Sequence, residues 1–135
     1  MTLYLLDTNI LSYFVQGIHP NLQQRMARAF QSEDFAISTI NRAEIRYGQN
    51  LMAAQDKRRL RVDLLLAESP TLPWTTAAAD NYGRIKALFK RKSIPIGEMD
   101  TQIAAHALAE DLILVTHNTR HFKNVPGLKF EDWFA

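Results

Sequence analysis

The chain has 135 residues, of which 47% are hydrophobic and 22% charged, a balance typical of a single globular domain rather than a disordered protein. We therefore expect one domain over residues 1–135. The absence of cysteine excludes disulfides and thiolate metal sites, and it favours a reducing, cytoplasmic compartment. No signal-peptide pattern and no apolar run of roughly 20 residues is present, so no membrane partner is expected. The net charge of +2 indicates a polyanionic partner only weakly.

The first half of the chain alternates short apolar runs with helical patterns. Residues 3–6 are apolar without alternation, which is typical of a parallel strand buried on both faces. Thr8 or Asn9 is expected to cap a short helix that Gly17 ends. Four further elements are expected: a helix with Pro20 in its first turn, a strand over 35–38, a helix that begins at Ser38 or Thr39 and ends before Gly48, and a helix capped by Asp56 with Leu60 and Leu64 facing inward.

The second half continues the same alternation. Residues 71–74 are expected to form an edge strand or a turn, because Pro73 cannot donate to a sheet. A long helix opens at Thr75 or Thr76, and another follows with Asp100 at its start. Strands are expected over 112–116 and 128–130. Strands that alternate with helices predict an α/β fold, with a central, mostly parallel sheet of four to five strands and helices on both faces.

Four polar residues fall where this architecture brings them together. Asp7 ends the first strand, Asn118 follows the strand over 112–116, and Glu44 and Asp100 lie early in their helices. Three carboxylates at one edge would repel each other unless a cation neutralised them. Oxygen ligands without thiolate favour Mg²⁺ or Mn²⁺ over zinc. The pattern therefore predicts metal-assisted hydrolysis of a phosphodiester.

Each of these residues also has a structural explanation. Asp7 and Asp100 can be helix caps, Glu44 a solvated helix residue and Asn118 a turn former. Two histidine patterns are weaker still. His117 and His121 have a zinc-like H-x₃-H spacing but no second pair of ligands, and His106 is expected to pack within its helix.

Five blocks of sequence carry a resemblance to a known family, and they span nearly the whole chain in the family's order. The blocks are LLDTNILSYF at 5–14, STINRAEIRYG at 38–48, IPIGEMDTQIAAHAL at 94–108, LVTHNTRHF at 114–122 and LKFEDWF at 128–134. The chain resembles the PIN-domain ribonucleases, and closely the VapC toxins of type II toxin–antitoxin modules. The resemblance implies an α/β/α sandwich and a Mg²⁺-dependent endoribonuclease that hydrolyses RNA with a metal-activated water. A structured RNA such as tRNA, inhibition by a VapB-like antitoxin and a homodimer are also implied.

The resemblance also assigns roles to individual residues. Asp7, Glu44 and Asp100 match the three principal acidic positions, so Asp7 and Asp100 are expected to hold the metal, with Glu44 assisting. Asn118 matches a position that is Asp in many relatives, and His121 stands where relatives often have Asp or Glu. These two departures leave fewer negative charges for a second metal. Glu98 is a further candidate ligand that can restore some of that charge or face solvent.

Several other residues are expected around the acids. The hydroxyls of Thr8 and Thr116 are candidates to orient Asp7 or a water molecule, although both can equally be caps or core residues. Tyr13 or Tyr47 can stack on an exposed base. Leu11, Tyr13, Phe14 and the helix over 40–47 are expected to form a groove for the antitoxin. Basic residues that can guide RNA, or simply form a solvated surface, are Arg46, Arg84, Lys86, Lys90, Arg91 and Lys92.

Two other functions are left open by the residues. A phosphoacceptor signalling domain also uses acids at strand ends, but it would want a second acid beside Asp7 and a lysine after a late strand, where Thr8 and His117-Asn118 stand. A PIN domain that binds RNA without cutting it is the second alternative. Its Mg²⁺ affinity would separate it from the enzyme.

Overall fold

The computed structural model describes residues 1–134, which are built around a five-stranded sheet. The strand order is β3-β2-β1-β4-β5, and every neighbouring pair is parallel. The expected α/β fold with four to five strands is confirmed. The strands are β1 Tyr4–Leu6, β2 Phe35–Ser38, β3 Thr71–Leu72, β4 Ile113–Val115 and β5 Phe130–Glu131.

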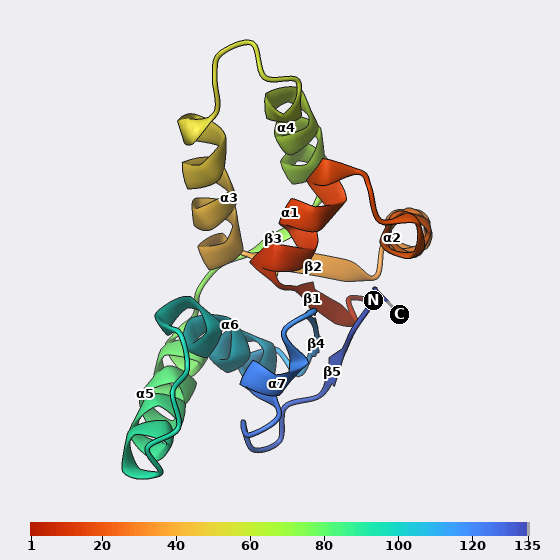
Figure 1. The fold of residues 1–135 in the computed structure, drawn as a ribbon. Helices are drawn as coiled ribbons and strands as arrows, with labels where there is room; N and C mark the ends of the chain where they lie inside the picture. The colour runs from red at the N-terminus through yellow and green to blue at the C-terminus, as the bar shows by residue number, and fades with distance from the viewer. Residues whose placement is uncertain (135) are drawn as a thin grey trace.

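Helices cover both faces of the sheet, with α1 to α4 on one side and α5 to α7 on the other (Figure 1). No helix of residues 1–134 is long and apolar enough to cross a membrane. The helices are α1 Thr8–Gln16, α2 Pro20–Ser32, α3 Thr39–Leu51, α4 Arg58–Glu68, α5 Thr76–Arg91, α6 Glu98–Ala109 and α7 Thr119–Phe122.

The central strand β1 separates two hydrophobic cores. Leu5 and Leu6 are both fully buried, but on opposite faces, because successive side chains of a strand alternate. Leu6 packs into the core beneath α1 to α4, and Leu5 packs into the core beneath α5 to α7. This two-sided burial explains why the first strand is an unbroken apolar run.

The helix boundaries follow from local chemistry. Gly17 ends α1 in a left-handed conformation with φ of 73°, and Pro20 occupies the first turn of α2 as expected. Thr75 caps α5 by accepting a hydrogen bond from the Ala78 amide. The cap of α1 differs from the prediction, because Asp7 itself caps the helix rather than Thr8 or Asn9.

Two expectations about α3 and α4 were wrong. α3 continues through Gly48 to Leu51, because a single glycine costs a helix only about 1 kcal/mol. Leu60 and Leu64 of α4 point to solvent, with exposed fractions of 63% and 57%. The buried residues of α4 are instead Val62, Leu65 and Leu66. Asp56 does accept a hydrogen bond from the Arg58 amide, but Lys57 occupies the cap position.

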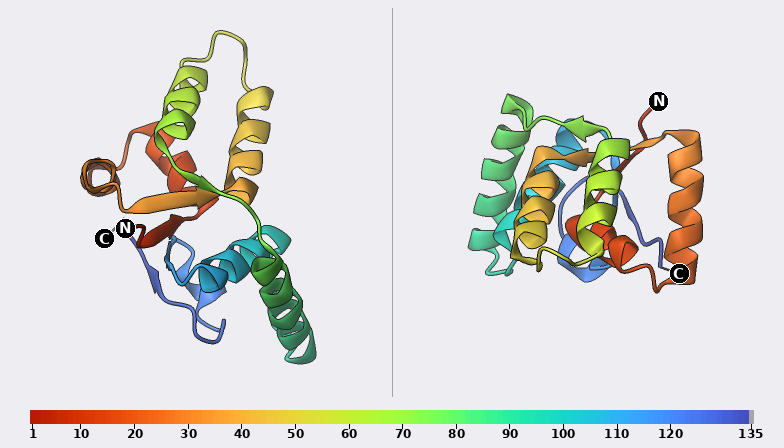
Figure 2. Two further views of the ribbon diagram at one scale, coloured as in Figure 1. Left: turned by 180° about the vertical axis from the view of Figure 1, so that it is seen from behind. Right: turned by 90° about the horizontal axis from the view of Figure 1, so that it is seen from above.

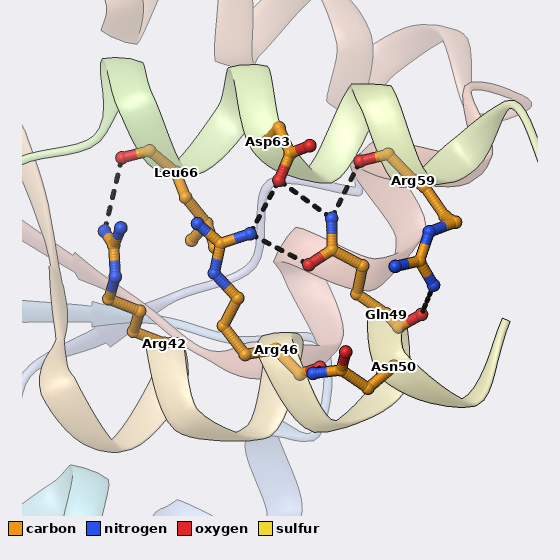
Figure 3. A network of polar contacts seen from close by, with 7 residues as sticks. All are labelled: Arg42, Arg46, Gln49, Asn50, Arg59, Asp63 and Leu66. Atoms are coloured by element: carbon orange, nitrogen blue, oxygen red, sulfur yellow. Dashed lines mark hydrogen bonds and ion pairs between the residues drawn. The ribbon is translucent and has the colours of Figure 1, made fainter. Parts of the chain in front are cut away.

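α3 and α4 form a hairpin that stands out from the sheet (Figures 1 and 2). Polar contacts join the two helices along their length (Figure 3). Gln49 is the central residue: its amide donates to the Arg59 carbonyl at 2.9 Å and to Asp63 at 2.9 Å. Arg46 reaches the same Asp63 carboxylate at 2.6 Å. The hydrogen bonds from Gln49 and Arg46 lower the pKa of Asp63, so this carboxylate stays charged.

Candidate active site

Asp7 lies at the carboxyl end of β1, where the chain turns directly into α1. Its carboxylate accepts hydrogen bonds from the Thr8 amide at 2.8 Å and from the Thr116 hydroxyl at 2.9 Å. Its side chain is 3% exposed. Burial raises the pKa of Asp7 to about 6, and the charges of Asp100 and Glu44 act in the same direction, while the two hydrogen bonds oppose them. Asp7 is therefore an acid that a nearby positive charge would stabilise.

Glu44 reaches this edge from α3 and is held there by Thr8. The Thr8 hydroxyl donates to Glu44 Oε1 at 2.6 Å and accepts from the Asn41 amide at 3.0 Å. Asn41 is fully buried, and its side-chain oxygen, Oδ1, accepts a hydrogen bond from the backbone amide of Ser38 at 2.9 Å. Ser38 and Asn41 form the capping box that begins α3. The start of α3 thus fixes both Thr8 and Glu44.

Asp100 lies in the first turn of α6. Its Oδ2 atom is 3.1 Å from Nδ1 of His121, which lies on α7. Gly97, the residue before α6, is also close, because a Cβ atom there would lie 3.6 Å from Asp100 Oδ2. His121 is therefore the direct neighbour of Asp100, a contact that the sequence did not predict.

Thr116 and Asn118 follow β4 at the same edge. Thr116 is fully buried, and its hydroxyl both donates to Asp7 and accepts from the Asn118 amide at 3.0 Å. The Asn118 side chain makes no hydrogen bond within residues 1–134. The hydroxyl of Thr116 thus contacts Asp7, whereas the hydroxyl of Thr8 contacts Glu44.

The acids fit a divalent cation by their chemistry. Within the described residues, no three His, Asp or Glu side chains already enclose a metal position. Each of the three carboxylates has its own hydrogen-bond donor: Thr116 for Asp7, Thr8 for Glu44 and His121 for Asp100. Asp100 and Glu44 are still near enough to raise the pKa of the buried Asp7. A cation bound by these oxygens would relieve that repulsion, and Mg²⁺ and Mn²⁺ prefer such ligands.

Three other candidate ligands are directed elsewhere. Glu98 is exposed and pairs with Lys86 at 3.1 Å, and it also accepts a hydrogen bond from Tyr82. These contacts lower the pKa of Glu98. His117 pairs with Asp132 at 3.0 Å, so it does not share a partner with His121. His106 is fully buried in α6, as expected, and lies 2.8 Å from the Ser38 hydroxyl.

The candidate RNA-binding cations divide into two groups. Arg46 is engaged by Asp63, Lys86 by Glu98, and Arg84 by Asn81. No ion pair forms at the other three within residues 1–134, and all three are exposed at the end of α5. These are Lys90, Arg91 and Lys92.

Sequence reasoning missed Asn41 and the contact between His121 and Asp100. The capping box usually has Glu or Gln at its third position, so Asn41 gives a weaker signal. Ser38 followed three residues later by a polar amide was nevertheless visible. The pairing of Asp100 with His121 depends on how α6 and α7 meet, and nothing in their local sequence specifies it.

Comparison with known proteins identifies the family to which this fold belongs. The PIN-domain family model matches residues 4–128. Ribonuclease VapC2 of Rickettsia felis is 30% identical over 97% of this chain and 98% of its own length. The tRNA(fMet)-specific endonuclease VapC of Salmonella typhimurium is 31% identical, over 98% of this chain and 99% of its own length. The crystal structure of DNA-bound VapBC from Salmonella typhimurium superposes with a TM-score of 0.90 at 31% identity, covering 98% of this chain and 99% of that one.

These likenesses extend over almost the full length of each relative. The parallel sheet covered by helices on both faces is thus the PIN architecture. The chain belongs to the PIN-domain family and, within it, to the VapC group.

Proposed function

We propose that this chain is the toxin of a VapBC-type pair and a divalent-metal-dependent endoribonuclease. One observation carries the proposal: a buried carboxylate, Asp7, lies at the carboxyl edge of the sheet with its pKa raised to about 6 beside two further acids. Such an arrangement is costly unless it serves a charged ligand. The named activities of the relatives support the same conclusion. Membership of the PIN family leaves the phosphoacceptor alternative without support.

Asp7 and Asp100 would hold Mg²⁺ or Mn²⁺, with Glu44 assisting from α3. When bound, the cation supplies Lewis-acid stabilisation of the negative charge that develops on the phosphate. Thr116 fixes the orientation of Asp7, and Thr8 fixes that of Glu44. The Asn118 side chain, which is free of hydrogen bonds within the described residues, is available to the scissile phosphate or its water.

Cleavage of total tRNA and a panel of short RNAs, with Mg²⁺ or EDTA, tests this function. We expect discrete products from the wild type that disappear with EDTA and with Asp100→Asn. Asp80→Asn is the matched control, because Asp80 is an exposed acid on α5 that makes no contact with the site. Cleavage that survives both EDTA and Asp100→Asn would reject the site. Mg²⁺ binding without cleavage would favour the binding-module alternative.

A VapB-like antitoxin is the proposed partner, and an apolar groove supports its placement. The expected groove needs correction, because Leu11 is fully buried in the core. A hollow of about 540 Å³ lies instead between α1, α2 and α4, with apolar walls that include Phe14, Phe30 and Leu64. Arg61 and Glu68 lie at its rim, as suits an amphipathic segment.

Binding of the cognate antitoxin to groove variants tests this placement. Leu64→Asp is expected to weaken binding at least tenfold, because it puts a charge into the apolar groove. Leu60→Asp is the matched control, since Leu60 is equally exposed on α4 but does not line the hollow. Equal affinities for the two variants would place the antitoxin elsewhere.

tRNA is the substrate that we favour, because one relative is named for cleaving tRNA(fMet). The exposed basic residues at the end of α5, which form no ion pair within residues 1–134, support a polyanionic substrate. The homodimer remains a prediction, which light scattering on the purified chain would test.

A further inference from the structure

A second hollow adjoins the acidic edge beside Asp100. It has a volume of about 600 Å³, within the range of about 300–1,000 Å³ that is typical of small-molecule sites. One wall is the loop between α5 and α6, and the other is α7 with the residues just after it. The lining residues are Ile94, Pro95, Ile96, Gly97, Arg120, His121 and Asn124.

The hollow and the acidic edge share a boundary. His121 lines the hollow, and its Nδ1 atom is 3.1 Å from Asp100 Oδ2. Gly97 lines it too, and a Cβ atom there would lie 3.6 Å from the same oxygen. A group that fills the hollow therefore lies next to whatever Asp100 binds.

The walls of the hollow differ in chemistry. Ile94 and Ile96 are half-buried against the core beneath α5 to α7, so they present a fixed apolar surface. Arg120 is exposed and makes no ion pair or hydrogen bond within the described residues. Asn124 is also exposed, and its amide offers a donor and an acceptor. An apolar face, a cation and an amide match the base face, the phosphate and the base edge of a nucleotide.

We propose that this hollow is the subsite for one nucleobase beside the cleaved phosphodiester of a single-stranded RNA. The proposal rests on the ribonuclease function proposed above and adds the residues that select the cut position. Ile94 and Ile96 contact the face of the base, Arg120 binds its phosphate, and Asn124 contacts its edge. A peptide occupant is less well supported, because neither isoleucine is among the exposed large apolar residues, whereas Leu64 of the antitoxin groove is.

The test combines two changes, removal of the base from the RNA and substitution of the residues that line the hollow, and measures each change alone and with the other. The substrate is a short single-stranded RNA that spans the bond cut by the wild type, with an abasic position placed at each nucleotide in turn. For the wild type, we expect kcat/KM to fall about tenfold at one position beside the cut. For Asn124→Ala and Ile96→Ala, we expect the same fall in kcat/KM on the intact RNA, mainly through a higher KM. Removing the base at that position should then lower kcat/KM little further.

Arg120→Gln should raise KM about tenfold for all of these RNAs, because it removes a phosphate contact. Lys123→Gln is the matched control, since Lys123 is an exposed cation next to α7 that does not line the hollow. Asn124 and Arg120 are both exposed, so their variants keep the test valid if Ile96→Ala folds poorly. An abasic effect in Asn124→Ala and Ile96→Ala that is as large as in the wild type would overturn the subsite.

A binding arm separates failure of the subsite from failure of the proposed function. Anisotropy of short labelled RNAs of each base is measured on Glu44→Gln protein, in which the hollow is unchanged. If the wild type does not cut RNA, a loss of binding with Arg120→Gln and Asn124→Ala, but not with Lys123→Gln, would still support the subsite. If the Glu44→Gln protein binds no RNA, the subsite is overturned. It is also overturned if Arg120→Gln and Asn124→Ala weaken binding of the antitoxin but not of RNA.

Discussion

At the scale of single residues, Asp7 links the site to the stability of the fold. A carboxyl group whose pKa rises from 3.8 to about 6 on folding takes up a proton as the chain folds. The stability from this group is complete below pH 3.8 and is lost as the pH rises through about 6. A rise in pKa of this size corresponds to about 3 kcal/mol of folding free energy. The ionised Asp7 therefore destabilises the metal-free protein at neutral pH.

Asp7→Asn tests this balance. In EDTA, the free energy of unfolding of the wild type should fall between about pH 3 and pH 7 by up to about 3 kcal/mol more than that of Asp7→Asn. Urea denaturation at several pH values measures the difference. If the free energy of unfolding depends on pH in the same way for both proteins, ionisation of Asp7 does not destabilise the fold.

Thr8 is the second residue with a specific prediction. Thr8→Val keeps the shape of the side chain but removes the hydroxyl between Asn41 and Glu44. We expect RNA cleavage to fall about 10- to 100-fold, because partners that orient a metal ligand typically contribute that much. Thr8→Ser retains the hydroxyl and should keep most of the activity. Equal losses in the two variants would mean that packing of the Thr8 methyl group, rather than its hydrogen bonds, is what matters.

Residue chemistry in the sequence predicted part of this arrangement. Asp7 and Asp100 follow recognisable strand and helix signals, and Thr116 was visible as a hydroxyl at a strand end. Their mutual contacts were not predictable, because they depend on the packing of distant elements. The bond between Thr116 and Asp7 joins residues 109 positions apart, and that between Asp100 and His121 joins α6 to α7.

At the scale of elements, α4 shows where periodicity alone misleads. Its leucines recur at helical spacing on two faces, and the sequence did not reveal which face meets the core. The hairpin with α3 decides this, because Asp63 turns towards Gln49 and Arg46 (Figure 3). With that face directed at α3, Leu65 and Leu66 pack into the core, and Leu60 and Leu64 are left outside.

A pair of leucine variants tests this orientation of α4. Leu65→Ala should destabilise the protein by about 2–5 kcal/mol, because Leu65 is 3% exposed in the core. Leu60→Ala should change stability by less than about 0.5 kcal/mol, since Leu60 is mostly in solvent. Urea denaturation measures both. A larger effect for Leu60→Ala would restore the orientation expected from the sequence.

At the scale of the whole molecule, the sequence predicted the fold class. It predicted the assembly of the site only in outline. Alternating strands and helices imply a parallel sheet, and parallel strands share one carboxyl edge. The strand order that places β1 between β2 and β4 comes from packing on both faces, with Leu5 in one core and Leu6 in the other. That order is what brings Glu44 and Asp100 to Asp7 from opposite sides.

Metal binding should therefore stabilise the whole fold. Mg²⁺ at about 100 times its dissociation constant would add about 2.7 kcal/mol to the free energy of unfolding. Thermal unfolding should show a rise in Tm for the wild type that EDTA reverses. Asp100→Asn should show little of this rise, and Asp80→Asn should show all of it. An equal rise in Asp100→Asn would place the bound Mg²⁺ outside the proposed site.

The central position of β1 also has a consequence for biosynthesis. A ribosome makes Asp7 109 residues before Thr116, the residue whose hydroxyl orients it. A nascent chain that lacks residues 100–116 has neither Asp100 nor the hydroxyl that orients Asp7. The nuclease proposed here would then be inert until residues 100–116 have been made. Antitoxin that is already present can therefore bind the toxin as soon as its active site forms.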